Sequence, residues 1–224
     1  MIVDRVDARA RLMSGVEHAV RDLAAGRSIV LLHTAGAAIV FAARTANPAQ
    51  MAFAIRHSSG FVQVALAAAQ CDRLMIPRAA EMYRHHSTTP GSQQCAGVDA
   101  ANGIGTGISA ADRARTARVL ADPTTVMTDL TRPGHLIPVS VDPDVSHEMS
   151  AASTASFLTR LATDNPAAVF AEIILDVDPV DLPSRLDVLD FARAHTMCSV
   201  DSFEVGSSTV DRQGVSSVDD SYST

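Results

Sequence analysis

One stretch, Gly103–Val141, carries most of the information about the fold: GIGTGISAADRARTARVLADPTTVMTDLTRPGHLIPVSV. It opens with a glycine-rich turn. Ser109 follows as a predicted helix N-cap, because its hydroxyl accepts from the exposed amides of a first turn. Asp112 adds a negative charge there, which the helix dipole favours. Good helix formers fill Ala110–Ala121, so the pattern predicts a helix over these residues.

The second half of this stretch predicts a turn and a strand. Arg132-Pro133-Gly134-His135 has the composition of a tight turn, and the apolar run Leu136–Val141 is typical of a buried strand. The turn places a guanidinium and an imidazole in a loop, where functional side chains concentrate.

Composition excludes several classes of protein. The chain has 224 residues, 47% of them hydrophobic, and a formal net charge of -7, which suits one domain and argues against a nucleic-acid partner. Its three cysteines are too few and too widely spaced for a disulfide framework or a zinc motif. The N-terminal residues lack the apolar core of a signal peptide, and no run is long enough to span a membrane. We therefore expect a cytoplasmic protein.

The remaining patterns predict helices interspersed with strands. Helices are predicted after Ser14, from Pro48, over 148–162 and over 186–195; strands over 28–32, 39–43, 61–67, 169–177 and 197–200; and surface loops over 33–38 and 78–97. This order favours an α/β fold of the α+β type, a single layered domain with helices packed on a mixed twisted sheet. We predict a partly ordered lead-in over 1–13, a domain over 14–205 and a disordered tail over 206–224.

The segments GIGTGISAADRARTARVLADP and RPGHLIPV resemble the core of the 3,4-dihydroxy-2-butanone-4-phosphate synthase family, which carries TTGISAADRARTI and RPGHVFPL over this interval. Weaker similarity extends from about Ser14 to about Val200. Members of the family are riboflavin-pathway lyases that convert ribulose 5-phosphate to formate and a four-carbon phosphate with a divalent metal. The resemblance implies the layered fold, a homodimer and a Mg or Mn cofactor.

The resemblance also assigns roles to residues. His135 matches the family's essential histidine and Glu172 its essential glutamate inside a late strand, so both are predicted to be catalytic. His147 matches a metal ligand. Three further residues are predicted to bind substrate: Thr106, Arg132 and Gln63, the last of which replaces a cysteine.

Other family positions differ. The family's acidic loop, roughly Asp-Asp-Glu-Asp-Arg-Glu-Asn-Glu-Gly-Asp, supplies a metal-binding glutamate, an aspartate base and an arginine. Here the corresponding connection is Leu32–Ala38, LHTAGAA, which has no acid and no arginine, and Asp144 stands where the family has a substrate-contacting arginine. Because a hard dication needs oxygen ligands, the sequence predicts an impaired metal site and makes the ordinary reaction doubtful. His33 and Glu148 are the candidate substitute ligands, although no spacing marks either of them.

Structural roles remain as alternatives. Arg132 and His135 would only fix the turn before a strand, His147 would be an exposed helix-start residue, and Glu172 would pair with Arg115. We expect neither a nucleic-acid partner nor a membrane partner. Three hypotheses for the function then remain. The first is a diverged enzyme whose small-molecule ligand is a polyhydroxy ketone. The second is a catalytically dead scaffold, and the third is the riboflavin-pathway lyase with substitute ligands.

Overall fold

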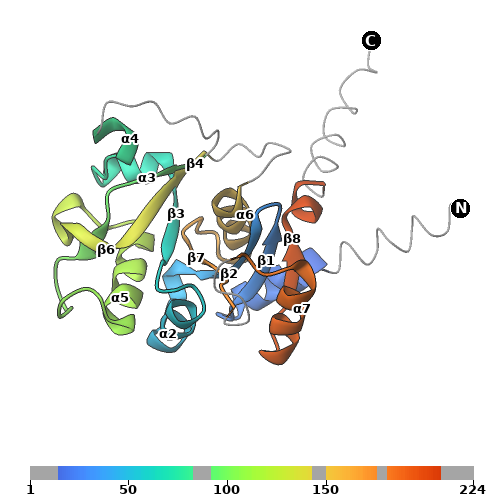
Figure 1. The fold of residues 1–224 in the computed structure, drawn as a ribbon. Coiled ribbons are helices and arrows are strands. Elements are labelled where there is room, and N and C mark those ends of the chain that lie inside the picture. Colours follow the sequence, from blue (N-terminus) through green and yellow to red (C-terminus); the bar gives the residue numbers. More distant parts are fainter. Residues whose placement is uncertain (1–14, 83–91, 143–149, 176–180, 208–224) are drawn as a thin grey trace, which may run out of the picture.

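The computed structural model describes residues 15–82, 92–142, 150–175 and 181–207 (Figure 1). Residues 15–24 and 202–207 are helical. The elements between them are β1 (Ile29–His33), β2 (Gly36–Ala42), the 3-10 turn η1 (Ala43–Thr45), α2 (Pro48–Arg56), β3 (Gln63–Ala67), α3 (Ala68–Arg73), α4 (Ala79–Met82), β4 (Ser92–Gln94), β5 (Val98–Ala100), α5 (Ala110–Ala121), η2 (Met127–Asp129), β6 (Leu130–Val141), α6 (Ala151–Thr163), β7 (Ala168–Glu172), α7 (Arg185–Ala194) and β8 (Ser199–Asp201).

The strands form one eight-stranded mixed sheet in the order β4-β6-β3-β7-β2-β1-β8, with β5 paired to β6. The pairs β3/β6 and β1/β8 are parallel, and the others are antiparallel. The predicted fold class, a layered α+β domain with a mixed sheet, is therefore confirmed.

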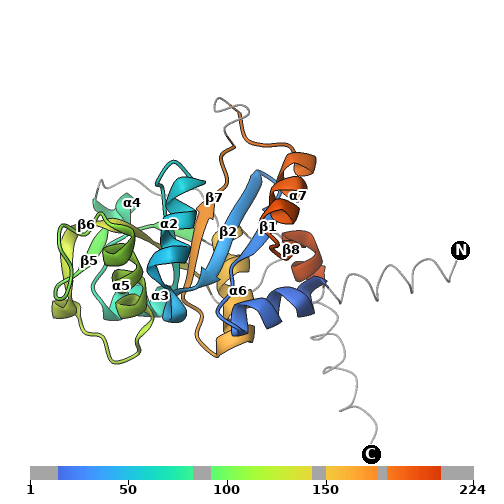
Figure 2. The same ribbon diagram turned by 90° about the horizontal axis from the view of Figure 1, so that it is seen from below.

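Helices cover both faces of the sheet (Figure 2). Alternate side chains of β2 point to opposite faces, as the pleat requires. Ile39 and Phe41 enter the core formed with α2, α5 and α7, whereas Ala38 and Val40 enter the core formed with α6 and the helix at residues 15–24. Burial on both faces accounts for the nearly continuous apolar composition of the central strands.

The structure confirms the predicted helix caps at Ser109 and Asn47. The Ser109 hydroxyl accepts from the backbone amide of Asp112 at 3.0 Å, and the Asn47 side chain accepts from the amide of Gln50 at 3.0 Å. Pro48 occupies the first position of α2, as predicted.

Replacing Ser109 by alanine should lower the free energy of unfolding by about 1 kcal/mol, because the first turn of α5 loses a side-chain acceptor. Chemical denaturation with an unchanged m-value measures this loss. Thr106→Ala is the matched control: Thr106 is exposed in the preceding turn, and its change should stay within about 0.5 kcal/mol. Equal losses in the two variants would contradict the capping assignment.

The predicted turn at Arg132–His135 is wrong in its form. Strand β6 runs unbroken from Leu130 to Val141, and its pairing with β5 shifts register between Val98 and Asp99. The Gly134 amide donates to the Gly97 carbonyl at 2.9 Å. The Arg132–Pro133 peptide bond is cis. The segment is thus a bulge held against β5, an arrangement in which a strand tolerates proline.

Several predicted boundaries also need correction. The connection over 33–38 is a β-hairpin, because His33 pairs with Gly36 and leaves only Thr34 and Ala35 in the turn. The loop over 78–97 contains α4 and β4, and β7 ends at Glu172. The first two residues of the predicted tail, 206 and 207, belong to the helical segment 202–207, and the rest of the tail lies outside the described residues. Tertiary pairing across the sheet, which local composition does not encode, sets these limits.

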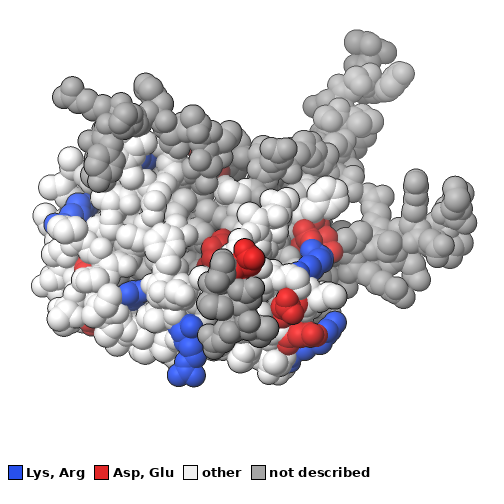
Figure 3. Space-filling view, in the orientation of Figure 1, with Lys and Arg blue, Asp and Glu red and all other residues white. Residues whose placement is uncertain are grey.

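On the face seen in Figure 3, arginine side chains are scattered among acidic ones and do not gather into a basic stripe. None of the three cysteines forms a disulfide. In the part of the chain that the structure describes, no helix has both the length and the apolar composition needed to cross a bilayer.

Candidate functional site

One edge of the sheet brings together residues that lie far apart in the sequence. Gln63, the first residue of β3, pairs with Ile137 of β6 on one side and with Phe170 of β7 on the other. His135 precedes Ile137 by two residues, and Glu172 follows Phe170 by two. Because β6 is parallel and β7 antiparallel to β3, both side chains lie beyond the same end of β3.

His135 is held by an aspartate. Its Nδ1 lies 2.7 Å from Asp99 Oδ2, and its backbone amide donates to Asp99 Oδ1 at 3.0 Å. The Asp99 side chain is 6% exposed and the His135 ring 41% exposed. An ionised carboxylate only accepts hydrogen bonds, so Nδ1 is the protonated nitrogen, and Nε2 of the neutral ring keeps a lone pair. This arrangement suits a general base.

Glu172 is also paired. Its Oε2 lies 3.0 Å from His33 Nε2, and Ala38 of β2 lies opposite it in the sheet. The alternative that Glu172 pairs with Arg115 is wrong, because the Arg115 Nε donates to the carbonyl of Asn102. The site therefore holds two carboxylate–imidazole pairs, Asp99–His135 and His33–Glu172.

Sequence reasoning missed Asp99, and it considered His33 only as a substitute metal ligand, not as the partner of Glu172. Asp99 lies in Val98-Asp99-Ala100, where an acid between small apolar residues already signals a buried carboxylate that needs a partner. No comparable local signal marks His33. Only the pairing of β2 between β1 and β7 brings it next to Glu172.

Thr106 lies in the glycine-rich turn before α5 and is exposed. The amides of Gly105 and Gly107 donate to the two carboxylate oxygens of Asp112 at 3.2 and 3.1 Å. These bonds hold the pKa of Asp112 below its usual range. These two amides are thus occupied by the chain itself.

The guanidinium of Arg132 is directed toward backbone carbonyl groups. It donates to the carbonyls of Leu74 at 2.6 Å, Met127 at 3.4 Å and Leu130 at 3.5 Å. This geometry fits the alternative in which Arg132 fixes the segment before a strand. Its role in substrate binding stays a prediction.

The described residues include no cluster of metal-binding side chains. Among them, no group of three or more His, Cys, Asp or Glu side chains is placed to hold a metal ion. Both oxygens of Asp99 bind His135, and the β1–β2 turn brings no carboxylate. The predicted ligand His147 lies outside the described residues, as do Asp144 and Glu148.

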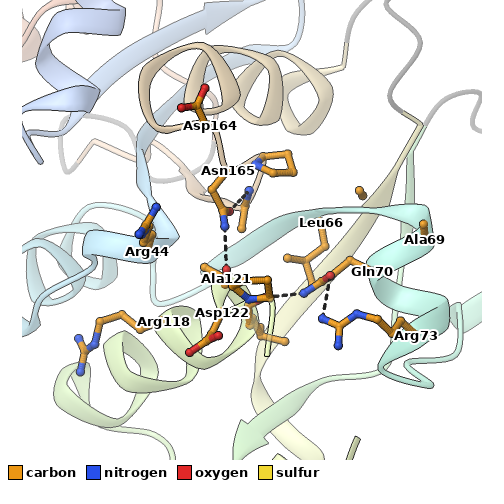
Figure 4. Close-up of a pocket in the computed structure, with 15 residues that line it drawn as sticks. Arg44, Leu66, Ala69, Gln70, Arg73, Arg118, Ala121, Asp122, Asp164 and Asn165 are labelled. Atoms are coloured by element: carbon orange, nitrogen blue, oxygen red, sulfur yellow. Dashed lines mark hydrogen bonds between the residues drawn. The ribbon is translucent and has the colours of Figure 1, made fainter. Parts of the chain in front are cut away.

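A described pocket lies at the opposite end of β3, next to Leu66 and Ala67, and Figure 4 shows the side chains that line it. It has a volume of about 850 Å³ and is lined by the end of β3, the end of α5 and the segment before β7. The side chains of Gln70 and Asn165 donate there to the carbonyls of Leu120 and Ala121 at 3.1 and 2.7 Å. These bonds cap the C-terminus of α5. None of the predicted site residues that the structure describes lines this pocket.

Solved structures share this fold. A 3,4-dihydroxy-2-butanone 4-phosphate synthase in complex with two magnesium ions is 26% identical, with a TM-score of 0.80 over 89% of this chain and 98% of that one. The enzyme from Candida albicans is 28% identical, with a TM-score of 0.75 over 85% and 94% of the two chains. RibBX from A. baumannii, a two-domain synthase, is 29% identical with a TM-score of 0.77 and covers 85% of this chain and 56% of that one.

Sequence comparison gives the same result. The riboflavin biosynthesis protein RibBA of Mycobacterium avium is 37% identical over 194 residues, and that of Mycobacterium tuberculosis H37Rv is 38% identical. These matches cover 84% of this chain and 45% of each relative, so the chain spans about half the length of the curated relatives it matches. The model of the family 3,4-dihydroxy-2-butanone 4-phosphate synthase matches residues 17–205. The chain therefore belongs to the 3,4-dihydroxy-2-butanone 4-phosphate synthase family.

Proposed function

We propose that this chain is a diverged member of its family, which binds a small polyhydroxy ketone at the edge of the sheet and moves protons next to its carbonyl group. The observation that carries the proposal is the presence of two carboxylate–imidazole pairs at an edge where the β1–β2 connection has no acid. A histidine fixed by a carboxylate is a suitable base for removing a proton next to a carbonyl.

The step itself is an enolisation. His135 Nε2 takes a proton from the carbon beside the carbonyl and leaves an enediolate, and a proton returned to that carbon restores a ketone. Atoms and charge balance with no oxidant or further reactant. Formate release would need further bond changes in the carbon skeleton, and the family's acidic loop, which the resemblance links to that chemistry, is replaced here by a hairpin turn.

The test is an NMR experiment on carbon-labelled ribulose 5-phosphate in D₂O with magnesium. We expect deuterium to enter the carbons beside the carbonyl, with no labelled formate above a no-enzyme control. Formate would favour the lyase reaction with substitute ligands instead. Failure to exchange deuterium into either ribulose 5-phosphate or unphosphorylated ribulose would reject the enolisation and favour the scaffold.

His135→Ala should lower the rate of deuterium exchange by about 100-fold or more, because a positioned base contributes on this order. His18→Ala is the matched control, since His18 is exposed on the helix at residues 15–24, and it should keep the native rate. Exchange that persists unchanged in His135→Ala would rule out His135 as the base.

The homodimer and the metal remain proposals taken from the resemblance, and the cytoplasmic location remains a proposal taken from the composition. Light scattering after size-exclusion chromatography tests the homodimer. Exchange measured with magnesium or manganese, and again with a chelator, tests the metal. An exchange rate that is the same in all three conditions would argue that the described residues act without the ion.

A further inference from the structure

The pocket at the end of β3 opposite Gln63 is a second concave surface of the domain. Its volume of about 850 Å³ is within the range of sites for small organic ligands. Four segments line it: η1, the end of β3 with α3, the C-terminal turn of α5, and the connection between α6 and β7. Because these segments are far apart in the sequence, only the fold creates this pocket.

The floor of the pocket is apolar and held in place by hydrogen bonds. Its buried lining residues are Leu66, Leu120, Ala121 and Ala167. The Gln70 and Asn165 side chains donate to the carbonyls of the two α5 residues, and Asn165 Oδ1 accepts from the amide of Ala167 at 3.0 Å. These backbone groups keep their partners when an apolar group covers them, which avoids the cost of burying an unpaired polar group.

The rim of the pocket carries more positive than negative charge. Its charged lining residues, all exposed, are Arg44, Arg73, Arg118, Asp122 and Asp164. Two of the arginines bind other parts of the chain. Arg73 donates to Gln70 Oε1 at 3.0 Å and to the carbonyl of Thr125, and Arg118 donates to the carbonyl of Ala46. The third, Arg44, is the one whose donors are available to a ligand.

Arg44 has a fixed backbone and an unengaged guanidinium. The Ala43 amide donates to the Ala167 carbonyl at 2.9 Å, and the Ala46 amide donates to the Ala43 carbonyl at 3.2 Å, so η1 is anchored to the segment before β7. The guanidinium forms no hydrogen bond or ion pair with any residue that the structure describes. In Figure 4 the side chain lies across the pocket from Ala69. A guanidinium placed in this way can pair with an acid group through two parallel N–H donors.

The two carboxylates of the rim leave Arg44 available. Asp122 Oδ1 accepts from the amide and the hydroxyl of Thr124 at 2.8 and 2.7 Å. These bonds, with a smaller contribution from the charge of Arg44, hold the pKa of Asp122 below its usual range. Asp164 is the C-cap of α6. In the described part of the chain, neither carboxylate forms an ion pair with Arg44.

We propose that this pocket binds a small organic anion with a flat apolar body. The acid group pairs with Arg44, and the body lies on the floor, where the short side chains of Ala121 and Ala167 leave room for a planar ring. An anion is favoured over a cation because the rim has three guanidinium groups and two carboxylates, one of which is engaged by Thr124. This site is separate from the proposed catalytic edge, since His135 lies beyond the other end of β3.

The test compares two probes that share a ring and differ in charge, 2-naphthoate and 2-naphthylmethylammonium. Each is titrated into ¹⁵N-labelled protein, and the backbone amide signals of Ala69, Gln70 and Ala121 are followed by NMR. We expect 2-naphthoate to shift these signals with a single dissociation constant. The ammonium probe should bind about tenfold more weakly or worse, because it cannot accept the charge-assisted hydrogen bonds of Arg44.

Two variants with matched controls locate the binding site. Arg44→Gln should weaken 2-naphthoate binding by about tenfold. Its control is Arg56→Gln, which changes an exposed arginine of α2 outside this pocket and should keep the affinity within about twofold, since a distant surface charge is screened. Ala69→Trp places a large side chain at the pocket and should weaken binding at least as much as Arg44→Gln. Ala111→Trp, at an exposed position of α5 outside the pocket, should keep native affinity.

Four outcomes would overturn the proposal: no shift of the pocket amides, equal affinity for the two probes, unchanged 2-naphthoate affinity in Arg44→Gln, or an equal loss in Arg56→Gln. Tighter binding of the ammonium probe would identify a cation site instead and would also reject it. Arg44 and Ala69 are exposed, so their replacement removes no buried packing and the variants should fold. The titrations need no turnover, so they succeed or fail independently of the deuterium-exchange test of the proposed function.

Discussion

Gly134→Ala should destabilise the domain by about 3 kcal/mol, since overpacking that forces the backbone to move costs on this order. A Cβ atom at this position would overlap the backbone of Val98 and the amide of Asp99. Both contacts are to backbone atoms, which cannot rotate away as a side chain can. The strand β5 and the bulge of β6 must therefore move apart. Equilibrium denaturation measures the loss of stability, and the Asp99–His135 contact should weaken with it.

Gly60→Ala is the matched control for this substitution. Gly60 has a φ of +82°, and its added Cβ would meet nothing within 4 Å. Its cost is therefore only that of a left-handed backbone, about 1–2 kcal/mol. Because the φ of Gly134 lies outside the left-handed region, its larger cost is steric. A loss for Gly134→Ala that did not exceed the loss for Gly60→Ala would contradict this account.

Gly107→Ala should damage the site more than the fold. Its Cβ would overlap the Asp99 carboxylate and lie 2.7 Å from His135 Nδ1, in a turn where Gly107 has a φ of +88°. The carboxylate and the ring must move apart to admit it. We expect deuterium exchange to fall about 100-fold, as for removal of the base, while unfolding free energy falls by about 1–2 kcal/mol.

Two measurements distinguish this prediction from a general loss of stability. The Nδ1–H signal of His135, which reports its bond to Asp99, should be lost or shifted in folded Gly107→Ala. Gly105→Ala, whose Cβ would make only an ordinary 3.5 Å contact with Asp112 Oδ2, should keep both the signal and the exchange rate. A native His135 signal in Gly107→Ala would show that the turn relaxes and that the close contact is unimportant.

Long separations along the chain explain why the resemblance identified only one residue of each carboxylate–imidazole pair. Family motifs marked His135 and Glu172 because each lies in a recognisable run of sequence. Their partners Asp99 and His33 are 36 and 139 residues away along the chain. Residues this far apart in the sequence form no recognisable spacing pattern, because the order of strands in the sheet decides which of them come into contact.

Local signals, by contrast, predicted local structure well. The capping residues Asn47 and Ser109 begin α2 and α5 as expected, since a cap needs only the next three residues to form its bond. The apolar composition of the predicted strands likewise indicated a buried sheet, and the burial of Ile39, Val40 and Phe41 confirms it.

The bulge at Arg132–His135 is a feature that local sequence patterns did not predict. Arg-Pro-Gly-His has the composition of a turn, yet the chain continues as a strand because Gly134 leaves room for the backbone of β5. By itself, the sequence determined the fold class, the helix starts and the family core motif, all of which depend on near neighbours. The hairpin in place of the acidic loop and the pairs Asp99–His135 and His33–Glu172 were decided by the tertiary structure, because strand pairing sets which side chains lie together.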